Sequence, residues 1–275
     1  MKQSTPGRRS ILSLFVALLG VPPARATPAP DARAAALRAT LARVGIALET
    51  RSDGVVAVTA GCNDVVDRLQ PDSCQRCILA DNRDITGEVL ERITAVVDRY
   101  PTEMLAQADI HTLSLCRRLE NIAAQKDILA GLSEYDGRHM MAVVSNPEFL
   151  ADILHHEIFH MIESARIADP TTHDQEWESV NPIGFSYGTG PSSSEARKAR
   201  PIGFVRQYAA SALVEDRAST FEYMMAVPDE LCEMATNDPI VHAKVKIIWS
   251  RMKRYAGGDE LMNSVAPCVR LAASP

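Results

Sequence analysis

The residues whose types and spacing could do chemistry lie between His155 and His160. His156 and His160 are four residues apart, so on an α-helix both imidazoles lie on one face and can bind one metal ion. Glu157 follows His156 directly, and its carboxylate can accept a proton from a metal-activated water. This H-E-x-x-H pattern predicts a hydrolytic zinc site with His156 and His160 as ligands and Glu157 as general base.

The flanking sequence predicts that this pattern lies on a helix. Asn146 is a favourable N-cap, Pro147 suits the first helical position, and Glu148 favours the positive end of the helix dipole. Apolar residues then follow at helical spacing: Leu150, Leu154, Ile158, Met161 and Ile162. The alternative interpretation is a buried helix whose histidines only form hydrogen bonds.

Elsewhere the pattern of apolar residues predicts an α+β fold, with a small mixed sheet before the histidine helix and a largely helical C-terminal part. We expect helices at 31–49 and 85–100, strands at 55–59, 110–115 and 140–144, and a loop-rich segment at 62–77. Residues 165–201 are polar and read as a long loop, placed to border a substrate cleft.

A catalytic zinc ion needs a third protein ligand and a position open to water. Glu215 and Glu222 are the candidates, because both fall in a predicted apolar helix further along the chain. They are seven residues apart, which is about 10 Å along a helix axis. Only one of them can therefore bind the ion, and the other can at most hydrogen-bond to a ligand.

Together with the histidine motif, two further groups of residues carry a family resemblance. These are Trp177, Asn181, Pro182, Phe185 and Tyr187, then Gly203, Phe204, Val205, Tyr208, Ala209, Glu215, Asp216, Arg217 and Ala218. Over roughly residues 110–226 the chain resembles the bacterial zinc-binding metallopeptidases, which are distant relatives of the lethal-factor-like zincins. The resemblance implies a zincin-like metallopeptidase domain.

In lethal-factor-like enzymes a tyrosine precedes the glutamate ligand by seven residues, and Tyr208 and Glu215 match that spacing. The resemblance thus implies Glu215 as the third zinc ligand and Tyr208 as a hydrogen-bond donor to the transition-state oxyanion. The lethal-factor pattern has a further glutamate four residues after the ligand, whereas this chain has Ser219 there.

We therefore expect a zinc-dependent metallopeptidase that hydrolyses peptide bonds in a peptide or protein substrate, with Zn²⁺ as its cofactor. A zinc-binding module without peptidase activity is the main alternative. A thiol–disulfide oxidoreductase built on Cys74-x-x-Cys77 is a third possibility, and it would require both thiols to be reduced.

The N-terminus has the features of a secretory signal peptide. Basic residues precede the apolar run 11–21, and the small-residue site Ala24-Arg25-Ala26 follows, which predicts cleavage after Ala26 and a secreted or periplasmic protein. The apolar run is too short to be a stable membrane anchor. Removing residues 1–26 deletes four basic residues and no acidic ones, so the formal charge moves from −6 to −10. Such an acidic chain argues against nucleic acid as a partner.

Six cysteines in an exported protein predict disulfides. We expect Cys232 to pair with Cys268, while the other four (Cys62, Cys74, Cys77 and Cys116) allow three connectivities. After the signal peptide, we expect an N-terminal helical and disulfide-tied region at 27–109, packed on a catalytic domain at 110–275. The sequence leaves the oligomeric state open.

Overall fold

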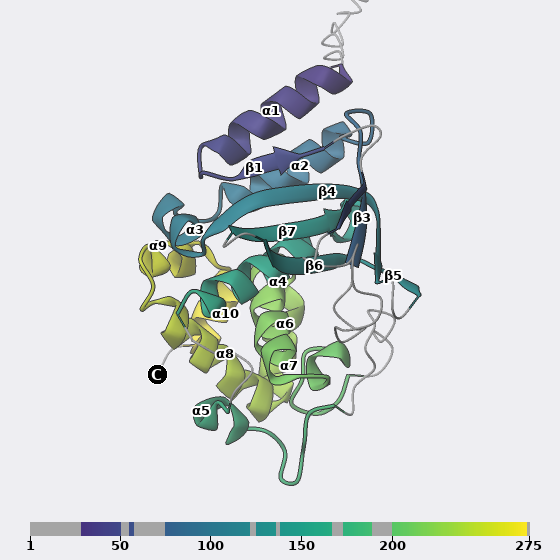
Figure 1. Cartoon of the computed structure of the whole chain (residues 1–275). Coiled ribbons are helices and arrows are strands. Elements are labelled where there is room, and N and C mark those ends of the chain that lie inside the picture. The colour runs from purple at the N-terminus through teal and green to yellow at the C-terminus, as the bar shows by residue number, and fades with distance from the viewer. Residues whose placement is uncertain are drawn as a thin grey trace, which may run out of the picture.

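The computed structural model describes residues 29–50, 55–57, 75–121, 125–135, 138–166, 173–188 and 200–273. A mixed β-sheet crosses the molecule, with α1 beside β1 and most of the C-terminal helices gathered on the other side of strand β6 (Figure 1). This is the predicted α+β arrangement of a mixed sheet followed by a largely helical C-terminal part. No helix among the described residues is long and apolar enough to cross a membrane.

The seven described strands form one sheet with the order β2-β3-β4-β7-β6, and β1 and β5 also pair with β4. The strands are β1 (Ala47–Glu49), β2 (Val55–Ala57), β3 (Gln75–Leu79), β4 (Ile110–Asn121), β5 (Lys126–Ile128), β6 (Ala130–Tyr135) and β7 (Arg138–Val144). The pairs β1–β4 and β4–β7 are parallel, and the other pairs are antiparallel. The chain leaves β7 directly into α4, the helix of the histidine motif.

The helices are α1 (Pro30–Ala42), α2 (Gly87–Val97), α3 (Thr102–Gln107), α4 (Pro147–Ser164), α5 (Gln175–Glu178), α6 (Leu213–Ala226), α7 (Pro228–Asn237), α8 (Pro239–Met252), α9 (Gly258–Ser264) and α10 (Pro267–Ala273). A short 3₁₀ turn, η3, spans Tyr208–Ala210. One apolar core joins α1, α2, α4, α6 and α8, and a smaller cluster around Leu79 and Leu119 involves β3 and β4.

Helix α4 begins as the sequence predicts. The Asn146 side chain accepts a hydrogen bond from the Glu148 backbone N–H at 3.1 Å, and Pro147 is the first helical residue. The predicted apolar stripe of this helix is buried, from Leu150 and Leu154 to Ile162. The capped start and the stripe fix which side of α4 faces the core, and hence where its histidines lie.

The predicted helix at 31–49 is wrong beyond Ala42. Gly45 has a φ of 80°, a left-handed conformation that ends the helix, and Ala47–Glu49 then pair in parallel with β4. Helical spacing of apolar residues could not reveal this, because the strand is defined by a partner more than sixty residues away. Likewise, the predicted strand at 110–115 extends to Asn121, and the end of the expected loop at 62–77 is strand β3.

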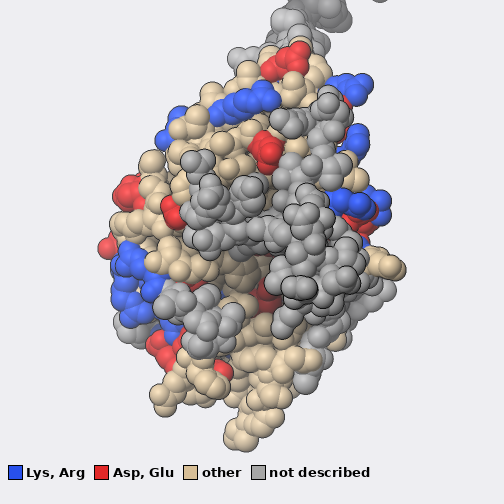
Figure 2. Space-filling view, in the orientation of Figure 1, with Lys and Arg blue, Asp and Glu red and all other residues tan. Residues whose placement is uncertain are grey.

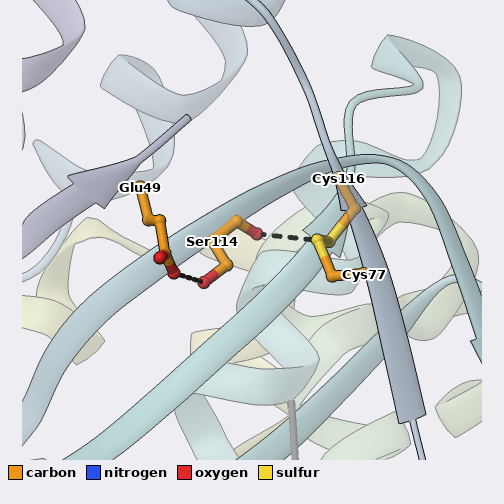
Figure 3. Close-up of a disulfide and its surroundings, with 4 residues drawn as sticks. All are labelled: Glu49, Cys77, Ser114 and Cys116. Carbon is orange, nitrogen blue, oxygen red and sulfur yellow. Dashed lines mark hydrogen bonds between the residues drawn. A yellow bond between two sulfur atoms is a disulfide. The ribbon is translucent and has the colours of Figure 1, made fainter. Parts of the chain in front are cut away.

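Two disulfides connect described residues. Cys232 pairs with Cys268 as predicted and joins α7 to α10, while Cys77 pairs with Cys116 and joins β3 to β4 (Figure 3). The bond from Cys77 to Cys116 rules out a redox pair between Cys77 and Cys74. Two disulfides are typical of a protein from an oxidising compartment, outside the cell or in the periplasm. The predicted signal peptide, Cys62 and Cys74 lie outside the described residues.

Candidate metal centre

Helices α4 and α6 bring the three predicted zinc ligands together. His156 Nε2 lies 2.9 Å from Glu215 Oε2 and 3.1 Å from His160 Nε2, and His160 Nε2 lies 3.6 Å from the same Glu215 oxygen. Among the described residues these three side chains form a group that could hold a metal ion. Two histidines of α4 and a carboxylate 55 residues after the second histidine thus meet at one point.

The donor set fits zinc in type and in spacing. Two imidazole nitrogens and one carboxylate oxygen are ligands of catalytic zinc sites, and such atoms bind tetrahedral zinc at about 2.0–2.1 Å. Ligand atoms around such an ion are therefore about 3.3–3.4 Å apart. The three separations here, 2.9, 3.1 and 3.6 Å, lie around that value. Three protein ligands also leave one position for water.

Aromatic packing holds α4 against α6 beside these ligands. The rings of Phe159 and Phe221 are stacked with centroids 4.8 Å apart, and both side chains are buried. Each phenylalanine is one residue away from a histidine or glutamate that faces the centre, His160 or Glu222. Core packing between the helices therefore sets the distance between the ligands.

Glu222 contacts the opposite side of the His156 ring from the other ligands. Its Oε2 lies 3.0 Å from His156 Nδ1, whereas Glu215 is at Nε2. Glu222 thus contacts the ring nitrogen of His156 that points away from Glu215 and His160. Burial alone would lower the pKa of His156, but hydrogen bonds to Glu215 and Glu222 raise it to about 9. These carboxylates would equally favour a metal cation at Nε2.

Glu215 and Glu157 differ in acidity. Burial would raise the pKa of Glu215, but hydrogen bonds from His156 and His160 hold it well below the usual value. Glu215 therefore remains a carboxylate, the form that binds metal. Burial raises the pKa of Glu157 despite the opposing effect of the two histidines. A carboxyl group that readily gains and releases a proton suits a general base.

Tyr208 lies on η3 next to the same ligands. Its ring centroid is 6.1 Å from that of His156, and its hydroxyl interacts with Glu215. Burial raises the pKa of Tyr208, and the neighbouring carboxylates of Glu215 and Glu157 raise it further. The phenol therefore keeps its proton and can act as a hydrogen-bond donor.

His155 points away from the centre. Its Nδ1 lies 2.7 Å from the hydroxyl of Tyr100, and both side chains are buried. Burial lowers the pKa of His155 to about 3, so the ring is neutral. His155 is a core residue that connects α4 to the turn after α2.

A buried charge next to Glu215 was not predicted from the sequence. Asp216 is fully buried and its Oδ2 accepts hydrogen bonds from Trp177 Nε1 and the Tyr187 hydroxyl, each at 2.8 Å. Lys244 Nζ lies 2.6 Å from the same oxygen. Asp216 therefore ties the segment 173–188 and helix α8 to α6. Trp177, Tyr187 and Asp216 are among the residues that carry the family resemblance, and Lys244 interrupts the apolar pattern of α8, but neither signal showed that these residues contact one another.

The predicted long loop at 165–201 is therefore wrong for part of its length. Residues 175–178 form helix α5, capped by the Asp174 side chain, and Trp177 is fully buried. Residues 167–172 and 189–199 lie outside the described part of the chain.

Two identical tetrapeptides, Pro-Ile-Gly-Phe at 182–185 and 201–204, form matching turns. In each turn the phenylalanine N–H donates to the proline carbonyl, and the glycine has a positive φ of 78° or 86°. The rings of Phe185 and Phe204 lie 4.6 Å apart, so the two turns are held together. These turns precede Tyr208 and help to place it near α6.

The protein surface is hollowed below the middle of the face shown in Figure 2, and acidic side chains are visible inside the hollow. A separate pocket of about 540 Å³ lies between α4, α5 and α8. It contains none of the predicted site residues. Its walls include the buried ion pairs that Arg217 makes with Glu163 and Asp174, and Arg251 binds the same aspartate. These ion pairs link α4, α6 and α8 to the residue before α5, so the charges in this pocket have a structural role.

No family model matches the sequence, and no curated protein matches it either. The fold is similar to that of a crystal structure from Bacteroides caccae described as a "putative zinc-binding metallo-peptidase". The TM-score is 0.52 with 12% sequence identity, over 90% of this chain and 95% of the other. At this identity the similarity concerns the fold.

Proposed function

We propose that this protein is an exported zinc-dependent peptidase whose metal is held by His156, His160 and Glu215. The observation that carries the proposal is the convergence of these three ligand atoms, within 4.8 Å of one another, beside the partly exposed Glu157. The similar fold of a protein described as a zinc-binding metallo-peptidase supports the same class of activity. The two disulfides support export.

The chain's own residues would divide the chemistry of peptide hydrolysis. Zinc, when bound, supplies a Lewis acid that polarises the scissile carbonyl and lowers the pKa of water toward neutrality. Glu157 takes the proton of the attacking water and delivers it to the leaving amine. Tyr208, which keeps its phenolic proton, donates a hydrogen bond to the oxyanion that develops on the carbonyl.

Zinc content is the first test of this proposal. We expect one zinc ion per chain in the mature protein, loss of the ion in His156→Ala and Glu215→Ala, and retention in Glu222→Ala, with weaker affinity. Glu157→Gln should retain zinc and lose turnover of a peptide library. A folded wild-type protein that binds no zinc, or a His156→Ala variant that retains it, would contradict the proposed site.

A zinc-binding protein without peptidase activity would give a different result. It would bind the metal through the same three ligands, yet it would cleave no peptide, and the Glu157→Gln variant would then be indistinguishable from wild type.

A further inference from the structure

The structure shows two carboxylates within hydrogen-bonding distance of one imidazole, and something must decide which of them binds the metal. Glu215 lies at Nε2 of His156 together with His160, and Glu222 lies at Nδ1. Both glutamates project from the same face of α6 two turns apart. One difference between their environments is the side chain of Arg206, which pairs with Glu222.

Arg206 contacts both carboxylate oxygens of Glu222. Its Nη1 donates to Glu222 Oε1 at 2.8 Å, its Nη2 contacts Oε2 at 2.5 Å, and its Nε donates to the Ser219 hydroxyl at 3.1 Å. The Glu222 side chain is 4% exposed and that of Arg206 is 17% exposed. A two-pronged pair of this kind fixes the carboxylate in orientation as well as in position.

Arg206 also lies close to the histidine itself. Its Nη2 is 3.2 Å from His156 Nδ1, and Glu222 Oε2 is 3.0 Å from the same nitrogen. The guanidinium can only donate, whereas the carboxylate can only accept. Nδ1 therefore has one neighbour that requires it to carry a proton and another that would require it to carry none.

We propose that Arg206 and Glu222 act together as positioning residues that keep the proton of His156 on Nδ1 and so leave Nε2 to the metal. This inference rests on the proposed zinc site. Arg206 holds the Glu222 carboxylate, which accepts a hydrogen bond from Nδ1–H and is kept from moving toward the ion. Arg206 in turn does not donate to Nδ1, because its charge is neutralised by Glu222. Hydrogen bonds to the second nitrogen of a ligating histidine set its tautomer in this way.

The pairing predicts an unusual pattern of zinc affinities. In Glu222→Met the guanidinium loses its carboxylate and lies 3.2 Å from Nδ1 in the parent structure. It then donates to Nδ1, and the ring proton moves to Nε2, where it competes with zinc. Removing Arg206 as well, in Glu222→Met/Arg206→Met, leaves neither tautomer favoured. The double variant should therefore bind zinc more tightly than the single variant.

Loss of such an outer hydrogen bond typically weakens metal binding about 10–100-fold. We expect about 100-fold weaker zinc binding in Glu222→Met and about 10-fold in the double variant, measured by competition with a chromophoric chelator. Arg206→Met keeps the carboxylate acceptor for Nδ1–H and should stay within about 10-fold of wild type. NMR of the zinc-loaded wild type should show the His156 ring proton on Nδ1.

The outcomes separate this inference from the proposed function. If wild type binds no zinc, the proposed site itself fails. If wild type binds zinc but the double variant binds no more tightly than Glu222→Met, Arg206 and Glu222 have only a structural role and the inference fails. If Glu222→Met does not fold, the zinc affinity of Arg206→Met tests the inference instead. A folded Arg206→Met protein with more than about 100-fold weaker zinc binding would overturn the inference.

Discussion

The buried pair of Lys244 and Asp216 gives the sharpest test of how this fold is held around Glu215. Lys244 Nζ lies 2.6 Å from Asp216 Oδ2 and 2.7 Å from the Gly203 carbonyl, and both side chains are at most 1% exposed. Burial raises the pKa of Asp216, and Lys244 opposes that rise. In Lys244→Met the carboxylate keeps Trp177 and Tyr187 as donors but loses its one positive partner.

We expect Lys244→Met to lower the free energy of unfolding by about 3–5 kcal/mol at pH 7. This is the usual cost of removing one partner of a buried ion pair and leaving the other charge buried and unpaired. An acid whose pKa is raised by folding destabilises the protein as the pH rises above its unfolded value. The deficit should therefore shrink as the pH falls, by up to about 1.4 kcal/mol per pH unit, as Asp216 takes up a proton.

The assay is urea unfolding of wild type and variant at pH 7 and pH 5. Lys246→Met is the matched control, because Lys246 lies on the same helix α8 but is partly exposed. It should change the free energy of unfolding by less than about 0.5 kcal/mol. A Lys244→Met deficit below about 1 kcal/mol at pH 7, or one that is equal at both pH values, would refute the reasoning.

Three further results are expected. Glu157→Gln should lower kcat by about 10²–10⁴-fold with unchanged zinc content, and near-normal turnover would exclude Glu157 as the general base. Tyr208→Phe should lower kcat by about 10²–10³-fold while zinc affinity stays within a few-fold of wild type, and loss of zinc would instead make Tyr208 a structural support of Glu215. Replacing both Cys232 and Cys268 by serine should lower the unfolding free energy by about 2–4 kcal/mol in denaturant titration, while an unchanged midpoint would show that the α7–α10 link adds no stability.

Local sequence signals predicted the part of the site that lies on one helix. The cap at Asn146 and the spacing of His156 and His160 act within a few turns, so α4 and its ligand face follow from the sequence. Glu215 required the family resemblance as well, because its approach to α4 depends on tertiary packing such as the stacking of Phe159 on Phe221.

Features that depend on residues far apart in the sequence could not be predicted from local sequence signals. Strand β1 exists because β4 offers it an edge, and the bond from Cys77 to Cys116 is one of three connectivities that the sequence allowed. The burial of Asp216 and Trp177 depends on Lys244, a residue 28 positions further along. The polar composition of residues 165–201 concealed this contact.

The contact between the phenylalanines of the two Pro-Ile-Gly-Phe turns has a consequence for how this chain can change during evolution. Phe185 and Phe204 lie 4.6 Å apart, so the chain between them starts and ends at neighbouring points. Doubling the length of a loop whose two ends are held together costs only about 0.6 kcal/mol in loop-closure entropy. Insertions, deletions and new sequences can therefore accumulate between the turns while α4 and α6 stay in register. This junction is where changes in chain length carry the least risk to folding.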